Sequence, residues 1–201
     1  MRTEIRITGF GGQGVVLSAY VVGRACAIQG GRHATMIQSF GPEARGSACS
    51  ATLVIEDTEV LYPYVRRPSY LVALSAEGYE KYRDELDDHG TLVVEKDLVR
   101  PEPREGQRIF GVPSTRIAES LGRSLVQNIA MLGFFTGVSK IATRDEMREA
   151  VKASVPPGTT ELNLEAFRSG LAYFDEHYGE EASGAAVEPA SQATGADPPS
   201  R

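Results

Sequence analysis

Short apolar runs alternate with amphipathic stretches along most of the chain, and this alternation predicts an α/β domain. The apolar runs are typical of strands and cover residues 4–8, 33–40, 47–56, 70–75, 91–96 and 108–112. Stretches with apolar residues three and four positions apart predict helices at 13–29, 77–86, 114–122, 124–141, 143–155 and 161–178. We therefore expect one domain over residues 1–178, a three-layer, Rossmann-like fold with helices around a mostly parallel sheet.

The predicted strand at 47–56 differs from the others in its pattern. Its apolar positions alternate with Ser50 and Thr52, so one of its faces is partly polar. A half-polar strand is typical of antiparallel pairing or of a sheet edge, whereas a continuous apolar run such as 70–75 is typical of a buried parallel strand. The pattern therefore favours a mixed sheet.

The predicted helix at 13–29 has almost no polar face. Only Ser18 and Arg24 mark a side that faces solvent. A helix that is apolar all round is buried on all sides. In a short chain we expect part of this burial to come from another subunit.

Polar residues and glycines predict where several elements begin and end. Gly30 and Gly31 are expected to end the first helix. Ser114 and Thr143 are expected to be the N-caps of two later helices. His89 precedes Gly90 and is expected in a turn.

Composition narrows the class of protein. The chain has 201 residues, 41% hydrophobic and 24% charged, with a formal net charge of −6. These values are typical of a soluble globular protein and argue against a general nucleic-acid binder. The absence of both a long apolar segment and a signal peptide at the start of the sequence predicts a cytoplasmic protein that does not cross a membrane. Residues 179–201 are small, polar and acidic, and we expect a disordered tail there.

Metal chemistry carried by this chain alone is not expected. The two cysteines, Cys26 and Cys49, do not form a C-x-x-C motif. The histidines at 33, 89 and 177 are far apart in sequence. Iron–sulfur clusters and structural zinc sites need more cysteine or histidine ligands in close spacing.

A glycine-rich loop follows the first predicted strand. Gly9, Gly11 and Gly14 match the spacing G-x-G-x-x-G and precede a helix. In such a turn, glycines permit a tight bend, close approach of a ligand, and packing of the helix on the strand. The helix amides can also attract an anion. The alternative is that the glycines serve close packing only.

The acidic residue that a dinucleotide site needs is missing. Such a site uses an Asp or Glu at the end of the second strand to bind ribose, but no acid occurs between Ile5 and Pro42. NAD is therefore disfavoured, as is NADP, because that strand end also lacks a basic residue. No Lys-Ser or Lys-Thr follows the loop, which excludes a P-loop. The acid-free span suits a phosphate-bearing ligand or an acidic partner surface instead.

Two motifs carry a resemblance to a known family. GFGGQGVV at 9–16 and QSFGPEARGS at 38–47 resemble the gamma subunit of 2-oxoacid:ferredoxin oxidoreductases. The resemblance extends to about residue 178, and Asn128 with 131–133 resembles a later helix of the family. Phe40 and Ser47 depart mildly from the tyrosine and glycine that the family often has there.

The resemblance implies a subunit of a larger enzyme rather than a complete one. Alpha and beta subunits would bind thiamine diphosphate, Mg and the 2-oxoacid, with a ferredoxin-like delta subunit as a further option. Iron–sulfur clusters in partner subunits would pass electrons to ferredoxin, and coenzyme A would take the acyl group. The resemblance favours 2-oxoglutarate as substrate, ahead of pyruvate, branched-chain and indolepyruvate types. This chain itself would be non-catalytic and hold no cofactor alone.

The two motif loops are the expected site. They follow strands predicted to lie side by side, so both should face the catalytic subunits and border coenzyme A. Gln13 would either contact a partner loop or a ligand, or cap its helix. Arg45 would bind an anion or pair with Glu43 or across an interface. The candidate residues are Gly9, Gly11, Gly12, Gln13, Gly14, Gln38, Ser39, Gly41, Pro42, Glu43, Arg45 and Gly46.

Other interpretations remain open at this point. The glycine motif also suits a stand-alone dinucleotide-binding reductase or a regulatory module that binds an adenylate. Arg66 and Arg67 are either a solvated pair or contacts for coenzyme A phosphates. Tyr62, Tyr64 and Tyr70 more often fill an interface than bind a cofactor.

Overall fold

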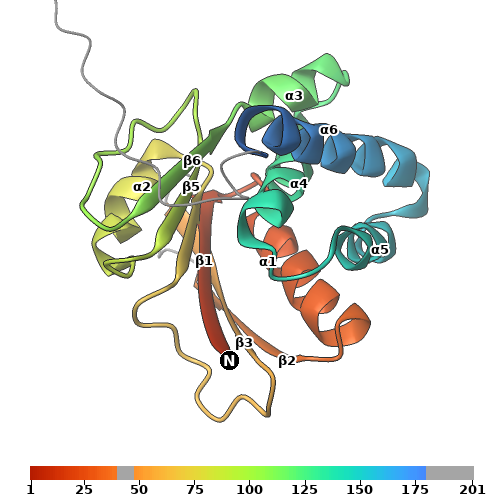
Figure 1. The fold of residues 1–201 in the computed structure, drawn as a ribbon. Helices are drawn as coiled ribbons and strands as arrows, with labels where there is room; N and C mark the ends of the chain where they lie inside the picture. Colours follow the sequence, from red (N-terminus) through yellow and green to blue (C-terminus); the bar gives the residue numbers. More distant parts are fainter. Residues whose placement is uncertain (40–47, 180–201) are drawn as a thin grey trace, which may run out of the picture.

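The computed structural model describes residues 1–39 and 48–179, and their strands form one six-stranded sheet in the order β2-β3-β1-β4-β5-β6 (Figure 1). The predicted tail therefore lies outside the described residues, apart from Gly179. The strands are β1 Arg2–Phe10, β2 His33–Ser39, β3 Ala48–Glu56, β4 Tyr70–Ala73, β5 Thr91–Glu95 and β6 Arg108–Val112.

Strand β3 makes the sheet mixed, as its pattern predicts. It pairs antiparallel with β1 on one side and with β2 on the other, whereas β1, β4, β5 and β6 are parallel neighbours. The expectation that β1 and β2 lie side by side is wrong, because β3 lies between them. Residues 40–47 are too few for a parallel crossover of a dozen or more residues, so β3 returns antiparallel beside β2.

Helices cover both faces of the sheet (Figure 1). On one face α2, Ala76–Tyr82, packs with Tyr79 and Tyr82 against alternate residues of β4 and β5. The other face carries the remaining helices, with α5 packed on α1 and α6 packed on α4. They are α1 Val15–Arg24, α3 Ser114–Ser120, α4 Gln127–Ser139, α5 Arg144–Ser154 and α6 Thr160–Tyr178. No helix in the described ranges has the length and apolar composition to cross a lipid bilayer.

Helix α1 is covered by this chain on its inner side only, and the expectation that another subunit covers the rest stays a prediction. It continues through a π-helical turn, Ala25–Gln29, and its outer side exposes Tyr20 by 47% and Ile28 by 67%. Ser18, expected on the solvent side, is buried, and its hydroxyl donates to the carbonyl of Gly14 at 2.9 Å. A serine can turn inward in this way because its hydroxyl bonds to the preceding helical turn. The apolar inner face is covered by this chain's own sheet and by α5.

Helix α4 is the helix that is buried all round. Every residue from Asn128 to Gly137 is buried. Glycines allow this, because the backbones of α4 and α6 meet directly. A Cβ at Gly133 would lie 2.0 Å from the carbonyl oxygen of Phe167, and one at Gly170 would lie 1.9 Å from the carbonyl oxygen of Ala130.

The predicted helix starts have different outcomes. Thr143 caps α5 in a capping box, accepting from the amide of Glu146 at 3.2 Å while the Glu146 carboxylate accepts from the Thr143 amide at 2.7 Å. Ser114 is not a cap: it lies in the first turn of α3, and its hydroxyl donates to the buried Glu95. The Glu95 carboxylate takes the place of a capping side chain, because it accepts from the amide of Thr115 in the first turn of α3 as well as from the Ser114 hydroxyl.

The packing of α4 on α6 predicts a large effect of one methyl group. Gly170→Ala should lower the free energy of unfolding by about 2 kcal/mol or more, because the new methyl overlaps the backbone of α4. Gly158→Ala is the matched control, since a Cβ there meets no described atom within 4 Å. It should change stability by less than about 0.5 kcal/mol. Denaturant unfolding followed by circular dichroism measures both, and equal losses would contradict the account.

Candidate functional site

The carboxyl edge of the sheet is where ligands of α/β proteins usually bind. Strands β1, β4, β5 and β6 are parallel, so the loops that follow them meet at this edge. After β1 the chain enters α1 on one face, and after β4 it enters α2 on the opposite face (Figure 1). The change of face places a topological switch point between β1 and β4, beside the glycine loop.

The side chain of Gln13 bridges this switch point. Its Oε1 accepts from the amide of Phe10 at 2.7 Å, and its Nε2 donates to the carbonyl of Leu74 at 3.2 Å. The amide of Gln13 also donates to the carbonyl of Phe10 at 3.1 Å, which closes a turn. The side chain of Gln13 thus joins the ends of β1 and β4. Its carboxamide group spans the crevice in which ligands of such sheets usually bind.

The glycines of the loop divide into a packed pair and an open pair. A Cβ at Gly9 would lie 2.6 Å from Gln13 Oε1, and one at Gly14 would lie 2.4 Å from Asn128 Nδ2. Gly14 also has a left-handed backbone, with φ of 74°. A Cβ at the exposed Gly11 or Gly12 would meet no described atom within 4 Å. Close packing therefore explains the first pair. Gly12 has a left-handed backbone with φ of 94°, which favours glycine, so only the glycine at Gly11 is left without a local explanation.

Asn128 fixes the loop from the far part of the chain. It is buried in the first turn of α4, and its Nδ2 lies 3.4 Å from both the carbonyl of Gly14 and the hydroxyl of Ser18. Only the family resemblance pointed to this residue, because the sequence shows a lone asparagine in an apolar helix.

The second expected loop begins at the same edge. Gln38 and Ser39 are exposed at the end of β2. Ser39 pairs with Ser50 while Gly9 pairs with Cys49, so the ends of β1 and β2 flank the start of β3. The two strand ends are thus separated by one strand. The other candidates, Gly41, Pro42, Glu43, Arg45 and Gly46, lie outside the described residues.

The basic residues of the acid-free span are mostly engaged by carboxylates from elsewhere. Arg6 is buried on β1, forms an ion pair with Glu85 at 2.5 Å and lies 4.3 Å over the ring of Tyr82. Arg32 pairs with Asp57 at 3.0 Å. These ion pairs could not be predicted from the sequence, because the arginines and their carboxylate partners are distant along the chain and are brought together by the fold.

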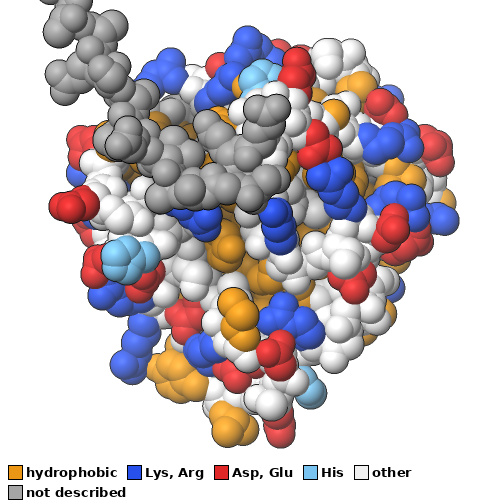
Figure 2. Space-filling view, in the orientation of Figure 1, with side chains coloured by type: hydrophobic (Ala, Val, Ile, Leu, Met, Phe, Trp, Pro, Cys, Tyr) orange, Lys and Arg blue, Asp and Glu red, His pale blue; other side chains and the backbone are white. Residues whose placement is uncertain are grey.

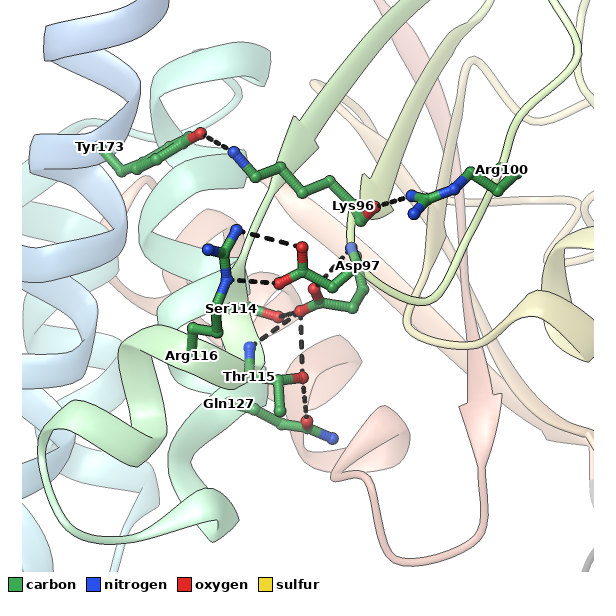
Figure 3. Close-up of polar contacts among 9 residues, drawn as sticks. Lys96, Asp97, Arg100, Ser114, Thr115, Arg116, Gln127 and Tyr173 are labelled. Atoms are coloured by element: carbon green, nitrogen blue, oxygen red, sulfur yellow. Dashed lines mark hydrogen bonds and ion pairs between the residues drawn. The ribbon is translucent and has the colours of Figure 1, made fainter.

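A buried carboxylate at the end of β5 was missed by the sequence analysis. Glu95 is 1% exposed and accepts from the Ser114 hydroxyl, from the Thr115 amide at 2.9 Å and from the Thr115 hydroxyl at 3.2 Å (Figure 3). The carboxylate thus lies at the amino-terminal end of α3, where helix amides favour negative charge. The sequence does contain a signal for this residue, because an acidic residue ends the apolar run TLVVE at residues 91–95.

The charged residues around Glu95 also have hydrogen-bond partners. Asp97 accepts both bonds of a bidentate pair from Arg116, at 2.7 and 3.1 Å (Figure 3). Lys96 donates to the hydroxyl of Tyr173, and Arg100 donates to the carbonyl of Lys96 at 2.5 Å. These contacts hold α3 and α6 against the end of β5, which is a structural role.

Thiol and metal chemistry find little support in the described residues. Burial raises the pKa of the Cys26 thiol to about 11 and also raises the pKa of Cys49, so both stay protonated near neutral pH. Within residues 1–39 and 48–179 no three His, Cys, Asp or Glu side chains group as a metal site requires.

Comparison with known proteins gives consistent matches. The family model described as pyruvate ferredoxin/flavodoxin oxidoreductase matches residues 4–173. "2-oxoglutarate synthase subunit KorC" of Methanocaldococcus jannaschii is 42% identical over 173 residues, covering 85% of this chain and 92% of that protein. "Pyruvate synthase subunit PorC" of Methanothermobacter thermautotrophicus is 35% identical over 176 residues, covering 85% and 93%. The solved gamma subunit of a keto/oxoacid ferredoxin oxidoreductase from Geobacter sulfurreducens has a TM-score of 0.76 at 33% identity, covering 85% and 96%.

The bridge made by Gln13 predicts a measurable loss of stability. Gln13→Ala should lower the free energy of unfolding by about 1–3 kcal/mol, because a backbone donor and a backbone acceptor lose their partner. Gln38→Ala is the matched control at the same edge, exposed on β2. It should change stability by less than about 0.5 kcal/mol. Chemical denaturation of the two variants tests this, and a neutral Gln13→Ala would show that the bridge is dispensable.

Proposed function

The chain belongs to the pyruvate ferredoxin/flavodoxin oxidoreductase family, and on that premise we propose that it is the gamma subunit of a 2-oxoglutarate:ferredoxin oxidoreductase. The complex converts 2-oxoglutarate and coenzyme A to succinyl-CoA and CO2, and two electrons pass to ferredoxin. The choice of 2-oxoglutarate as substrate rests on sequence identity. The chain is 42% identical to a 2-oxoglutarate synthase subunit over most of both chains, against 35% to a pyruvate synthase subunit.

The residues of this chain support a non-catalytic role within the complex. An iron–sulfur cluster takes four cysteine ligands, and the sequence holds two, one in the extension of α1 and one in β3. The buried carboxylate of Glu95 already accepts hydrogen bonds from Ser114 and Thr115 at the start of α3. Thiamine diphosphate, Mg and the clusters therefore belong to the alpha, beta and any ferredoxin-like delta subunit, which supply the carbon–carbon cleavage and electron transfer.

The geometry opposes a stand-alone dinucleotide-binding reductase. In such an enzyme the crevice between β1 and β4 receives the cofactor, and an acid at the end of β2 binds its ribose. Here Gln13 bridges the crevice and Gln38 stands near the end of β2. An adenylate-binding module would meet the same obstacles.

The exposed part of the carboxyl edge supplies the contact with the partners. Gly11 and Gly12 present bare backbone, and Gln38 and Ser39 are exposed one strand away. Glycine without neighbouring side chains lets another backbone or a ligand approach closely. We assign the loops 9–14 and 38–46 to the surface that faces the catalytic subunits and borders coenzyme A.

The substrate assignment predicts the specificity of the assembled enzyme. The purified complex should reduce ferredoxin with 2-oxoglutarate at a kcat/KM at least about 100-fold above that for pyruvate. The physical reason is that a pocket built for the second carboxylate of 2-oxoglutarate leaves buried polar groups unpaired when pyruvate binds. Rates with both acids at saturating coenzyme A measure this, and a preference for pyruvate or a branched-chain acid would overturn the choice of substrate.

The assignment of the edge predicts the effect of charge at the open glycine. Gly11→Asp should raise the KM for coenzyme A about tenfold or weaken assembly, because coenzyme A is a polyanion and the corner would become negative. Arg45→Ala should act in the same direction by removing a cation. Gly158→Asp adds the same charge at another open glycine and should alter neither property. Unchanged KM and intact subunit composition in both test variants would contradict the assignment.

A further inference from the structure

A cavity of about 270 Å³ lies at the amino-terminal edge of the sheet, opposite to the glycine loop. It is bounded by the starts of β1, β4, β5 and β6 and by the end of α4, with Arg2, Tyr70, Thr91, Arg108 and Ser139 in its lining. We propose that this cavity binds a small metabolite through an oxyanion, a phosphate or a carboxylate. Such a site goes beyond the role of the chain as a gamma subunit.

The lining of the cavity is basic in an acidic protein. Arg2, Arg32, His89, Arg108 and Lys140 contribute to it, and its described lining includes no Asp or Glu. The whole chain carries a formal charge of −6, so a lining without carboxylates differs from the average surface, although Arg2 and Arg32 pair with carboxylates outside the lining. Figure 2 shows basic side chains around an apolar patch on the face that includes the start of the chain. A concave basic surface raises the local concentration of anions.

Arg108 differs from the other arginines of this lining because its contacts within the described residues are uncharged, including the ring of Phe110 at 6.0 Å. Arg2 pairs with Glu4 and Glu56 at 2.8 and 2.5 Å, and Arg32 pairs with Asp57 at 3.0 Å. Arg108 instead donates to the neutral hydroxyl of Thr91 at 3.0 Å and has no carboxylate partner among residues 1–39 and 48–179. Its guanidinium therefore retains donors that suit a phosphate or carboxylate in bidentate geometry.

The uncharged groups of the lining support an oxyanion rather than a cation. Hydroxyls of Ser69 and Thr91 border the cavity and can donate to an oxyanion, whereas the Tyr70 hydroxyl donates to the carbonyl of Ser139. Burial raises the pKa of Tyr70, so its phenol keeps its proton. The carbonyls of Ser139 and Ile141, which would attract a cation, accept from Tyr70 at 3.4 Å and from Arg32 at 3.3 Å.

The size of the cavity limits the ligand. A volume of about 270 Å³ is at the lower end of small-molecule sites and too small for a dinucleotide. The ligand class is thus a small phosphorylated or polycarboxylate metabolite. Because the cavity lies at the edge opposite to the glycine loop, its occupant would not compete with the surface assigned to the catalytic subunits.

The test is a binding titration of the full chain with two probes at constant ionic strength, set with sodium chloride. Inorganic phosphate and citrate are added separately, and two-dimensional NMR follows the backbone signals of the lining residues. Saturable shifts with at least one probe are expected, and the tighter probe tells a phosphate site from a carboxylate site. No saturable shift with either probe would overturn the proposal.

Paired variants separate a built site from general attraction of anions. Arg108→Gln should weaken binding of the effective probe at least about tenfold, as expected for loss of a charge-assisted hydrogen bond. Arg104→Gln removes the same charge from an arginine that pairs with Asp84 outside the cavity, and binding should be unchanged. Equal weakening in both variants would overturn the proposal, since it would show only the net charge of the chain. Circular dichroism confirms that both variants are folded.

Discussion

The burial of α4 on every side is the constraint on which the rest of the structure depends. A helix in that place needs the sheet beneath it and another helix above it, and both must come very close. Gly133 and Gly170 provide the closeness, because a side chain at either one would overlap the facing backbone. On the sheet side Phe135 meets Tyr70 edge to face, with ring centroids 5.5 Å apart. Helix α6 is thereby held as the outer cover of the domain.

The same helix connects the core to the functional edge. Its first turn carries Asn128, which meets the carbonyl of Gly14 and the hydroxyl of Ser18. Gln13 holds the other side of the loop to the end of β4. The glycine loop is thus fixed from α4 and from the sheet, while Gly11 and Gly12 stay uncovered by described atoms. A glycine loop that is fixed in this way and exposes backbone at Gly11 and Gly12 suits contact with a partner surface, since little conformational entropy is lost on binding.

The pattern of apolar and polar residues predicted most helices and strands of this fold, but little of how these elements pack and in which order the strands pair. Alternation of Ser50 and Thr52 with apolar residues correctly indicated antiparallel pairing of β3. Both side chains are nevertheless buried, and they bond to Tyr82 and to the carbonyl of Ile37 rather than facing solvent. The place of β3 between β2 and β1 did not follow, since strand order depends on contacts distant in sequence. Apolar composition could not tell α1 from α4 as the central helix, and only packing shows that Ser18 turns inward. Ser114 was misread for a similar reason: its acceptor, Glu95, comes from another strand.

The two edges of the sheet differ in where open space and charged side chains lie. The carboxyl edge, where a crevice normally opens, is bridged by Gln13. Asp97 and Arg116 form an ion pair near this edge, and Lys96 donates to the hydroxyl of Tyr173. The amino edge has an open cavity and an arginine, Arg108, without a carboxylate partner in the described part of the chain. The Gln13 bridge spans the crevice where a nucleotide normally binds in such a sheet, while Gly11 and Gly12 beside it stay exposed. At the amino edge, open space and an arginine whose hydrogen-bond partner is a neutral hydroxyl occur together, which is why the proposed oxyanion site lies there.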